Sequence, residues 1–82
     1  MKKLEGNTAT LGLTNVSSIT IKISEDGESV QYQFNNGNES DEIKEALISY
    51  KQGDEEDGTL YPVFHACDGN CYFLYEFLRD NY

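Results

Sequence analysis

The chain has few of the residues on which most small functional sites depend. Its 82 residues include no tryptophan, one proline, one histidine and two cysteines. In the cytosol Cys67 and Cys71 would stay reduced, and no segment reaches the ~20 apolar residues of a membrane span. The first residues hold two lysines with no apolar run behind them. We therefore expect no secretory signal, and a cytoplasmic location.

Positive charge is also scarce. Six lysines and arginines stand against 15 aspartates and glutamates, for a net charge of −9. Phosphates would be repelled, which argues against direct contact with nucleic acid or an anionic membrane. The long-range partners of such a chain are cations or basic protein grooves. With 38% hydrophobic residues, six tyrosines and four phenylalanines, the chain is too apolar for a disordered tail and is long enough for one domain, residues 1–82.

Two alternating segments predict a β-hairpin. The hairpin opens the predicted folded core, residues 18–82. The residues before it, 1–17, are rich in glycine, threonine and asparagine. We interpret them as a loosely ordered N-terminal arm with a short extended piece at 8–13. In 18–24 and 29–34 apolar residues alternate with polar ones, as in half-buried strands, and Asp26–Gly27 between them favours a tight turn. The residues expected to face the core are Ile19, Ile21, Ile23, Val30, Tyr32 and Phe34.

Helical periodicity follows in two places. Ile43, Ala46, Leu47 and Tyr50 recur at i, i+3, i+4 and i+7 and predict a helix over about 40–51, with acids at its N-terminus, where the helix dipole favours them. At 60–66 Pro62 excludes a central strand and favours an edge strand or a turn. A second helix is expected at about 71–80, capped by Asp68 or Asn70, although residues 68–70 are also compatible with the turn of a second hairpin. The predicted fold class is α+β: a small antiparallel β-sheet with a central β-hairpin, packed against one or two α-helices.

The candidates for metal or nucleophilic chemistry are incomplete. His65, Cys67 and Cys71 supply three possible zinc ligands, whereas a closed structural site needs four. Ordinary thiols beside a turn are the preferred interpretation; a disulfide, a metal site and a cysteine nucleophile remain alternatives. The acidic run 54–57 lacks the alternating oxygen ligands of a calcium loop. We therefore predict no catalytic residue, no metal and no cofactor.

Three acidic clusters are the candidate partner-binding surface. They can simply keep a small protein soluble. They can also mimic the regularly spaced phosphates of DNA and occupy a groove built from lysine and arginine. The candidate residues are Glu25, Asp26, Gly27 and Glu28 in the predicted turn; Glu39, Asp41, Glu42 and Glu45 at the start of the predicted helix; and Asp54, Glu55, Glu56 and Asp57 in the following loop.

The central part of the chain resembles a family of small phage-encoded type II-A anti-CRISPR proteins, which mimic DNA in the cleft of Cas9 that reads the protospacer-adjacent motif (PAM). The resemblance covers about forty of the 82 residues. It implies that Asp26, Gly27 and Glu28 match the hairpin tip that the family inserts into Cas9, and that Asp54–Asp57 match the acids facing the PAM-reading residues. The chain lacks the family's helical N-terminus and adds an aromatic, cysteine-bearing tail. The matched positions are Ser18–Ile19–Thr20, Ile21, Ile23, Asp26–Gly27–Glu28, Asn38–Glu39–Ser40, Ile43, Ala46, Ile48–Ser49–Tyr50, Lys51–Gln52–Gly53 and the acids after them.

We therefore predict a non-enzymatic phage or mobile-element protein that mimics the charge of DNA and blocks a nucleic-acid-binding protein in a bacterial host cell. The resemblance names Cas9 with its guide RNA as the partner. The alternative is a structural or dimerising prophage domain, so the expected state is a monomer or a weak homodimer. In that alternative an aromatic tail packs on a second copy; its residues are Tyr72, Phe73, Tyr75, Phe77 and Tyr82.

Overall fold

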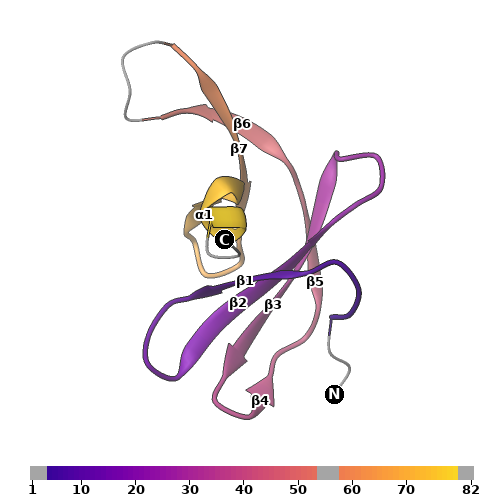
Figure 1. The fold of residues 1–82 in the computed structure, drawn as a ribbon, viewed down its shortest axis with the longest axis vertical. Coiled ribbons are helices and arrows are strands. Elements are labelled where there is room, and N and C mark those ends of the chain that lie inside the picture. Colours follow the sequence, from indigo (N-terminus) through magenta and orange to yellow (C-terminus); the bar gives the residue numbers. More distant parts are fainter. Residues whose placement is uncertain (1–3, 54–57, 80–82) are drawn as a thin grey trace.

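In the part of the chain that the structure describes, short antiparallel strands predominate and one short helix follows them (Figure 1). The computed structural model describes residues 4–53 and 58–79. In chain order the elements are β1 (Ala9–Gly12), β2 (Ser17–Ile23), β3 (Ser29–Asn36), β4 (Glu39–Ser40), β5 (Lys44–Leu47), β6 (Ser49–Gln52), β7 (Leu60–His65), β8 (Cys71–Phe73) and α1 (Leu74–Arg79).

The predicted hairpin is confirmed as strands β2 and β3. Their register places Ile21 opposite Tyr32 and Ile19 opposite Phe34. The Ser24 amide donates to the Ser29 carbonyl at 2.9 Å and closes a four-residue loop. Gly27 in that loop has a φ of +72°, a conformation that side chains with a Cβ rarely adopt. The Asp-Gly pair therefore marks the turn because the turn needs a residue with positive φ, which glycine adopts readily.

Strand β2 is also paired on its other side. Within the stretch expected to form an N-terminal arm, β1 pairs with β2 and places Ala9 opposite Ile21. Strands β4 and β5 both pair with β3, so the first sheet has five strands, in the order β1-β2-β3-β4 with β5 also on β3. Ala9 is buried, which makes β1 part of the covered face of this sheet.

The predicted helix over 40–51 is wrong, and so is the α+β fold class. Residues 44–47 form β5, whose register places Ala46 opposite Val30 and Leu47 opposite Ser29. The chain then bends at Ile48 and enters the second sheet as β6. Ala46 packs against the core, but Leu47 and Tyr50 are 78% and 64% exposed. The apolar residues spaced at helical intervals therefore do not share one buried face.

The second sheet has three strands in the order β6-β7-β8. Strand β7 is its middle strand, so the expectation of an edge strand or turn at 60–66 is wrong. Pro62 is accommodated because it is paired on one side only, opposite Tyr50 of β6, whereas the ladder to β8 starts at Val63. A proline without an N–H donor is tolerated where no second strand pairs with it.

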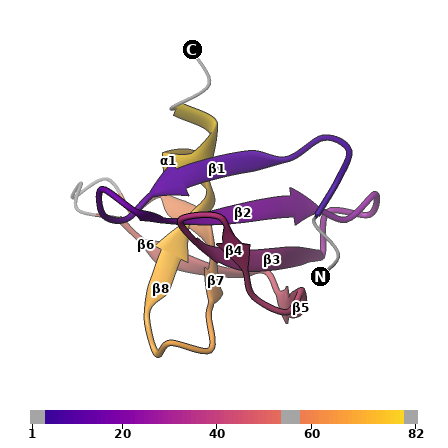
Figure 2. The same ribbon diagram turned by 90° about the horizontal axis from the view of Figure 1, so that it is seen from below.

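The C-terminal segment combines both alternatives considered from the sequence. A turn through Asp68 and Gly69 joins β7 to β8, with the Ala66 amide donating to the Asn70 carbonyl at 3.0 Å. Residues 71–73 are a strand, so the predicted helix is shorter than expected and begins only at Leu74. Helix α1 packs against β1 and β7, and Figure 2 shows β7 and β8 running across the direction of β1, β2 and β3.

The core lies between the two sheets and α1. Ile19, Ile21, Val30 and Tyr32 are buried there as predicted, whereas Phe34 is half-buried and Ile23 is 37% exposed. The second sheet and α1 contribute the other large residues: Phe64, Tyr72, Leu74 and Phe77. The ring centroids of Tyr32 and Phe64 are 5.4 Å apart, which joins the sheets. The Tyr32 hydroxyl also accepts a hydrogen bond of 3.0 Å from the Cys67 amide.

Candidate functional site

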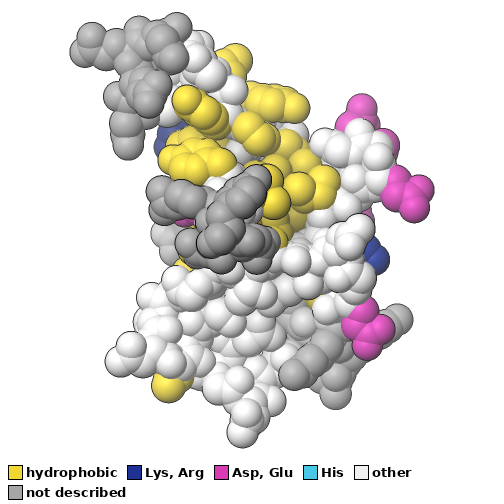
Figure 3. All heavy atoms as spheres, in the orientation of Figure 1, with side chains coloured by type: hydrophobic (Ala, Val, Ile, Leu, Met, Phe, Trp, Pro, Cys, Tyr) yellow, Lys and Arg dark blue, Asp and Glu magenta, His cyan; other side chains and the backbone are white. Residues whose placement is uncertain are grey.

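The β2–β3 turn presents three carboxylates from a locally fixed loop. Glu25, Asp26, Gly27 and Glu28 are all exposed. The Asp26 carboxylate accepts hydrogen bonds from the Ser24 hydroxyl and, at 3.0 Å, from the Glu28 amide. These bonds, the Ser24 hydroxyl first, hold the pKa of Asp26 below its ordinary value. Acidic side chains gather at this tip in Figure 3. The turn therefore holds the Asp26 carboxylate in place and exposes the Glu25 and Glu28 carboxylates beside it.

The second predicted cluster is divided among different elements. Glu39 lies on β4, Asp41 and Glu42 lie between β4 and β5, and Glu45 lies on β5, all of them exposed. No helix begins here, so the stabilisation expected from a helix dipole does not apply. The third predicted cluster, Asp54–Asp57, lies outside the described residues. The structure thus keeps the turn together as one group and separates the members of the second group.

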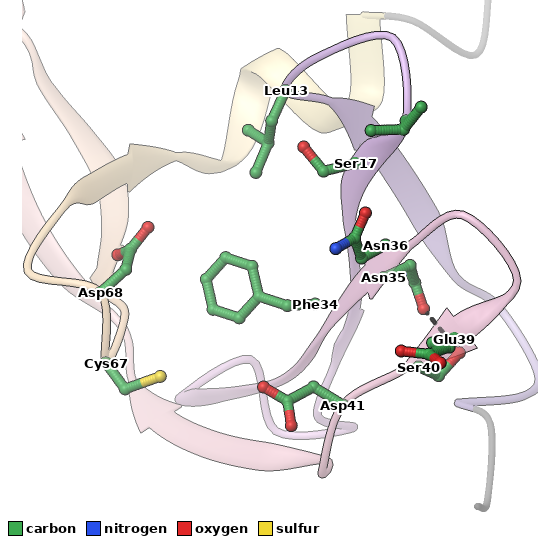
Figure 4. Close-up of a pocket in the computed structure, with 11 residues that line it drawn as sticks. Leu13, Ser17, Phe34, Asn35, Asn36, Glu39, Ser40, Asp41, Cys67 and Asp68 are labelled. Atoms are coloured by element: carbon green, nitrogen blue, oxygen red, sulfur yellow. Dashed lines mark hydrogen bonds between the residues drawn. The ribbon is translucent and has the colours of Figure 1, made fainter.

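Glu39 and Asp41 line an open hollow of about 690 Å³ together with a third acidic residue, Asp68. Figure 4 shows the Phe34 ring in the middle of this hollow, with Asp68 and Cys67 to its left, Asp41 below it and Leu13 above it. Phe34 comes from β3 and Asp68 from the β7–β8 turn. Neither residue was predicted as a site residue, because their approach depends on how the two sheets pack.

Asp68 is held in place by its own turn. Its carboxylate accepts hydrogen bonds from the Asn70 amide at 2.9 Å, the Asn70 side chain at 3.0 Å and the Tyr72 hydroxyl at 2.7 Å. Partial burial raises the pKa of Asp68, but these donors outweigh it and leave the pKa below its ordinary value. Burial, followed by the bond to Asp68, raises the pKa of Tyr72. Asp68 is therefore ionised at neutral pH.

The two thiols and the histidine flank the β7–β8 turn, and Cys67 lines the hollow beside Asp68 (Figure 4). Both cysteines are free; Cys67 is exposed and Cys71 is half-buried. His65 is exposed and lies opposite Cys71 across the β7–β8 pair. Over residues 4–53 and 58–79, no group of three histidine, cysteine, aspartate or glutamate side chains is placed to hold a metal ion.

An apolar surface extends from the end of β5 in the first sheet onto β6 and β7 of the second, and was not predicted. Leu47, Tyr50 and Leu60 are 78%, 64% and 61% exposed, and we call these three residues the β6 surface. Figure 3 shows hydrophobic side chains gathered over β6, β7 and α1. The helical interpretation of 40–51 concealed this feature, because it placed Leu47 and Tyr50 in a buried stripe.

The aromatic tail considered for dimerisation is mostly part of the protein's own core. Tyr72 and Phe77 are buried, Phe73 is half-buried, and Tyr75 is 42% exposed. Tyr82 lies outside the described residues. Phe64 stacks on Tyr72 with ring centroids 5.6 Å apart. Tyr72 and Phe77 are thus committed to intramolecular contacts rather than to a second copy.

Comparison with known proteins gives no relative from which to transfer a role. No protein-family model matches the chain, and no curated protein or solved structure is significantly similar to it. Among the helical residues that the structure describes, no helix is long and apolar enough to cross a membrane.

Proposed function

We propose that this protein is a non-enzymatic inhibitor that occupies the basic groove of a nucleic-acid-binding protein by mimicking the charge of DNA. The observation that supports this best is the β2–β3 turn, where Glu25, Asp26 and Glu28 are exposed and the loop is fixed by the Asp26 hydrogen bonds. A loop whose backbone and Asp26 carboxylate are already ordered loses less conformational entropy on binding than a flexible acidic tail does. A net charge of −9 steers the molecule toward a basic partner.

The hollow around Phe34 adds a second negatively charged contact region. Glu39, Asp41 and Asp68 surround it, and no lysine or arginine lines it among the described residues. Carboxylates of this kind pair with arginine and lysine side chains. Charged groups on two separate parts of the surface suit an extended basic groove better than a single cation.

The setting that follows is the cytoplasm of a bacterial host cell, with a phage or mobile element as the source. Cas9 loaded with guide RNA is the first partner to test, because its PAM-reading cleft is basic and binds a DNA duplex. The resemblance that suggests it included a helix at 40–51, where the structure has strands. The proposal therefore depends on charge and turn geometry, and other basic nucleic-acid-binding proteins are equally open to the same mechanism.

The test compares two double variants that remove the same charge. Glu25→Gln with Glu28→Gln removes two carboxylates from the turn, and Glu5→Gln with Glu76→Gln removes two from elsewhere. Each protein is immobilised, exposed to a bacterial lysate at low salt and eluted with a salt step, and the eluted proteins are identified. A parallel assay measures displacement of a PAM-containing duplex from guide-loaded Cas9.

We expect the parent and the control variant to retain nucleic-acid-binding proteins that salt releases. The turn variant should bind them at least about tenfold more weakly, because rim charges set the association rate and its salt dependence. Equal retention by all three proteins, or retention that high salt does not release, contradicts charge mimicry by the turn. If the protein retains other nucleic-acid-binding proteins but does not displace DNA from Cas9, the choice of Cas9 as partner is contradicted and charge mimicry is not.

A further inference from the structure

The exposed apolar side chains of the β6 surface form a group. Tyr50 lies opposite Pro62 and Gln52 lies opposite Leu60 in the β6–β7 register. Since alternate residues of a strand share a face, Tyr50 and Leu60 lie on the same face of this pair. Single exposed apolar residues are common, but neighbouring ones on a charged protein mark an interaction surface.

This surface is continuous with the acidic turn. Leu47, Ile48 and Tyr50 line a hollow of about 350 Å³ together with Gly27 and Glu28 of the turn. The Ile48 amide donates to the Glu28 carbonyl at 2.9 Å, which fixes the start of β6 beside the turn. A partner that reaches Glu28 therefore also meets the apolar side chains of Leu47 and Tyr50.

The outer edge of β6 is available to an extended segment. All four residues of β6 are exposed, and within the described residues β6 pairs with β7 alone. Unpaired strand edges bind extended peptides through backbone hydrogen bonds, with side chains at alternate positions giving specificity. The edge lies next to Tyr50 on one side and close to Glu28 at its start.

Charge selects the occupant. A second copy would bring another net charge of −9 and another acidic turn to the same place, at an electrostatic cost. Lys51 is the basic residue of β6, and it points to the face opposite Tyr50 because it is the adjacent position on the strand. A segment with a basic residue for Glu28 and an apolar residue for Tyr50 satisfies both halves of the surface.

We infer that the β6 surface is an apolar anchor that binds an extended segment of the partner in which an apolar side chain neighbours a lysine or arginine. This inference rests on the proposed function and adds to it: the partner is recognised as a protein, by apolar contact beside the charged contact, and not only as a binder of polyanions. The buried aromatic or aliphatic anchors of an interface usually contribute most of its affinity.

The test uses two synthetic peptides of equal charge. One repeats Lys-Ser-Val-Ser and the other repeats Lys-Ser-Ser-Ser, so that only the apolar residue differs, and lysine and valine fall on one face of an extended chain. Binding of each labelled peptide is measured by anisotropy to the parent, to Tyr50→Ser with Leu47→Ser, and to Leu78→Ser. Leu78 is 48% exposed on α1, beside Ile23 and outside both the β6 surface and the hollow around Phe34, and is the control. Melting temperatures verify that each variant is folded.

We expect the valine peptide to bind the parent and Leu78→Ser about tenfold more tightly than the serine peptide, with this advantage lost in the Tyr50 and Leu47 variant. An equal advantage in all three proteins contradicts the inference. So does a parent that sediments as a concentration-dependent dimer and becomes monomeric in the Tyr50 and Leu47 variant, since the occupant is then a second copy. The two double variants of the previous section separate the two proposals. If neither of them binds the peptides more weakly than the parent does, charge mimicry is contradicted. The tighter binding of the valine peptide than of the serine peptide then still tests the apolar anchor.

Discussion

Asp68 and Tyr72 show how single side chains stabilise the turn beside the Phe34 hollow. The tyrosine ring is part of the core, while its hydroxyl reaches the carboxylate of a residue at the surface. The carboxylate organises the turn through Asn70 and contributes charge to the hollow at the same time. A residue that lines a binding surface is thus supported by the packing beneath it.

Replacing Tyr72 by Phe should remove the hydroxyl and keep the ring. Loss of a hydrogen bond to a charged group costs about 1.5 kcal/mol of stability at pH 7. The pKa of Asp68 is lowered in the folded protein, so its contribution is present above 3.8 and is lost as the pH falls through the folded value. Urea unfolding at pH 7 and at pH 2.5 measures both stabilities, and the difference between variant and parent should narrow at the lower pH. A difference that is constant with pH would contradict the charged bond.

Ile21→Asp should unfold the protein. Ile21 is 1% exposed between β1 and β3, and an unpaired carboxylate there costs several kcal/mol against a total stability of about 5–10 kcal/mol. Gln31→Asp is the control, because Gln31 lies on β3 and is exposed. Circular dichroism melting should show a folded control and an unfolded core variant. Similar melting of the two variants would mean that both faces of the first sheet are equally buried or equally open.

Among the strands and turns, those whose conformation is set by neighbouring residues could be predicted from the sequence, and those set by long-range pairing could not. Asp26 and Gly27 determine their turn by backbone conformation and short-range hydrogen bonds, so the hairpin was recognisable in the sequence. Ala46 and Leu47 are good helix formers, yet pairing of β5 with β3 overrides that propensity. Pro62 can lie in a middle strand because β8 ends at Phe73, opposite Val63, and leaves Pro62 without a partner on that side. The residues around Pro62 do not indicate this. The hollow around Phe34 is lined by residues from both sheets, so its formation could not be predicted from the sequence alone.

The switch from the first sheet to the second at Ile48 gives an element-scale prediction. Ile48→Pro removes the amide that donates to the Glu28 carbonyl, and should destabilise the protein by about 1–3 kcal/mol. Ile48→Val keeps the donor and removes one methylene, at a cost of about 1 kcal/mol. Denaturant unfolding compares the two, and hydrogen exchange reports on the Ser29 and Gly27 amides of the turn. Equal stability of the two variants would show that this hydrogen bond does not join the turn to β6.

At the scale of the whole molecule, the excess of acids is a cost to folding. A net charge of −9 on 82 residues produces self-repulsion, which salt screens. The melting temperature should therefore rise by a few degrees between 10 mM and 300 mM sodium chloride. The Glu25→Gln and Glu28→Gln variant should melt at or above the parent at low salt and gain less from added salt. A parent whose melting is independent of salt would show that the folded acids do not repel one another appreciably.

The hydrogen bond between the Cys67 amide and the Tyr32 hydroxyl has a consequence for the order of folding. It joins groups 35 positions apart in the chain, whereas β1-β2-β3 and β6-β7-β8 are each built by pairing sequence neighbours. Local pairings form quickly and long-range ones slowly, because closing a longer loop costs more entropy. The two sheets are therefore expected to assemble as separate meanders before they dock. Removing the Tyr32 hydroxyl should then accelerate unfolding and leave the refolding rate nearly unchanged, the signature of a contact made after the transition state.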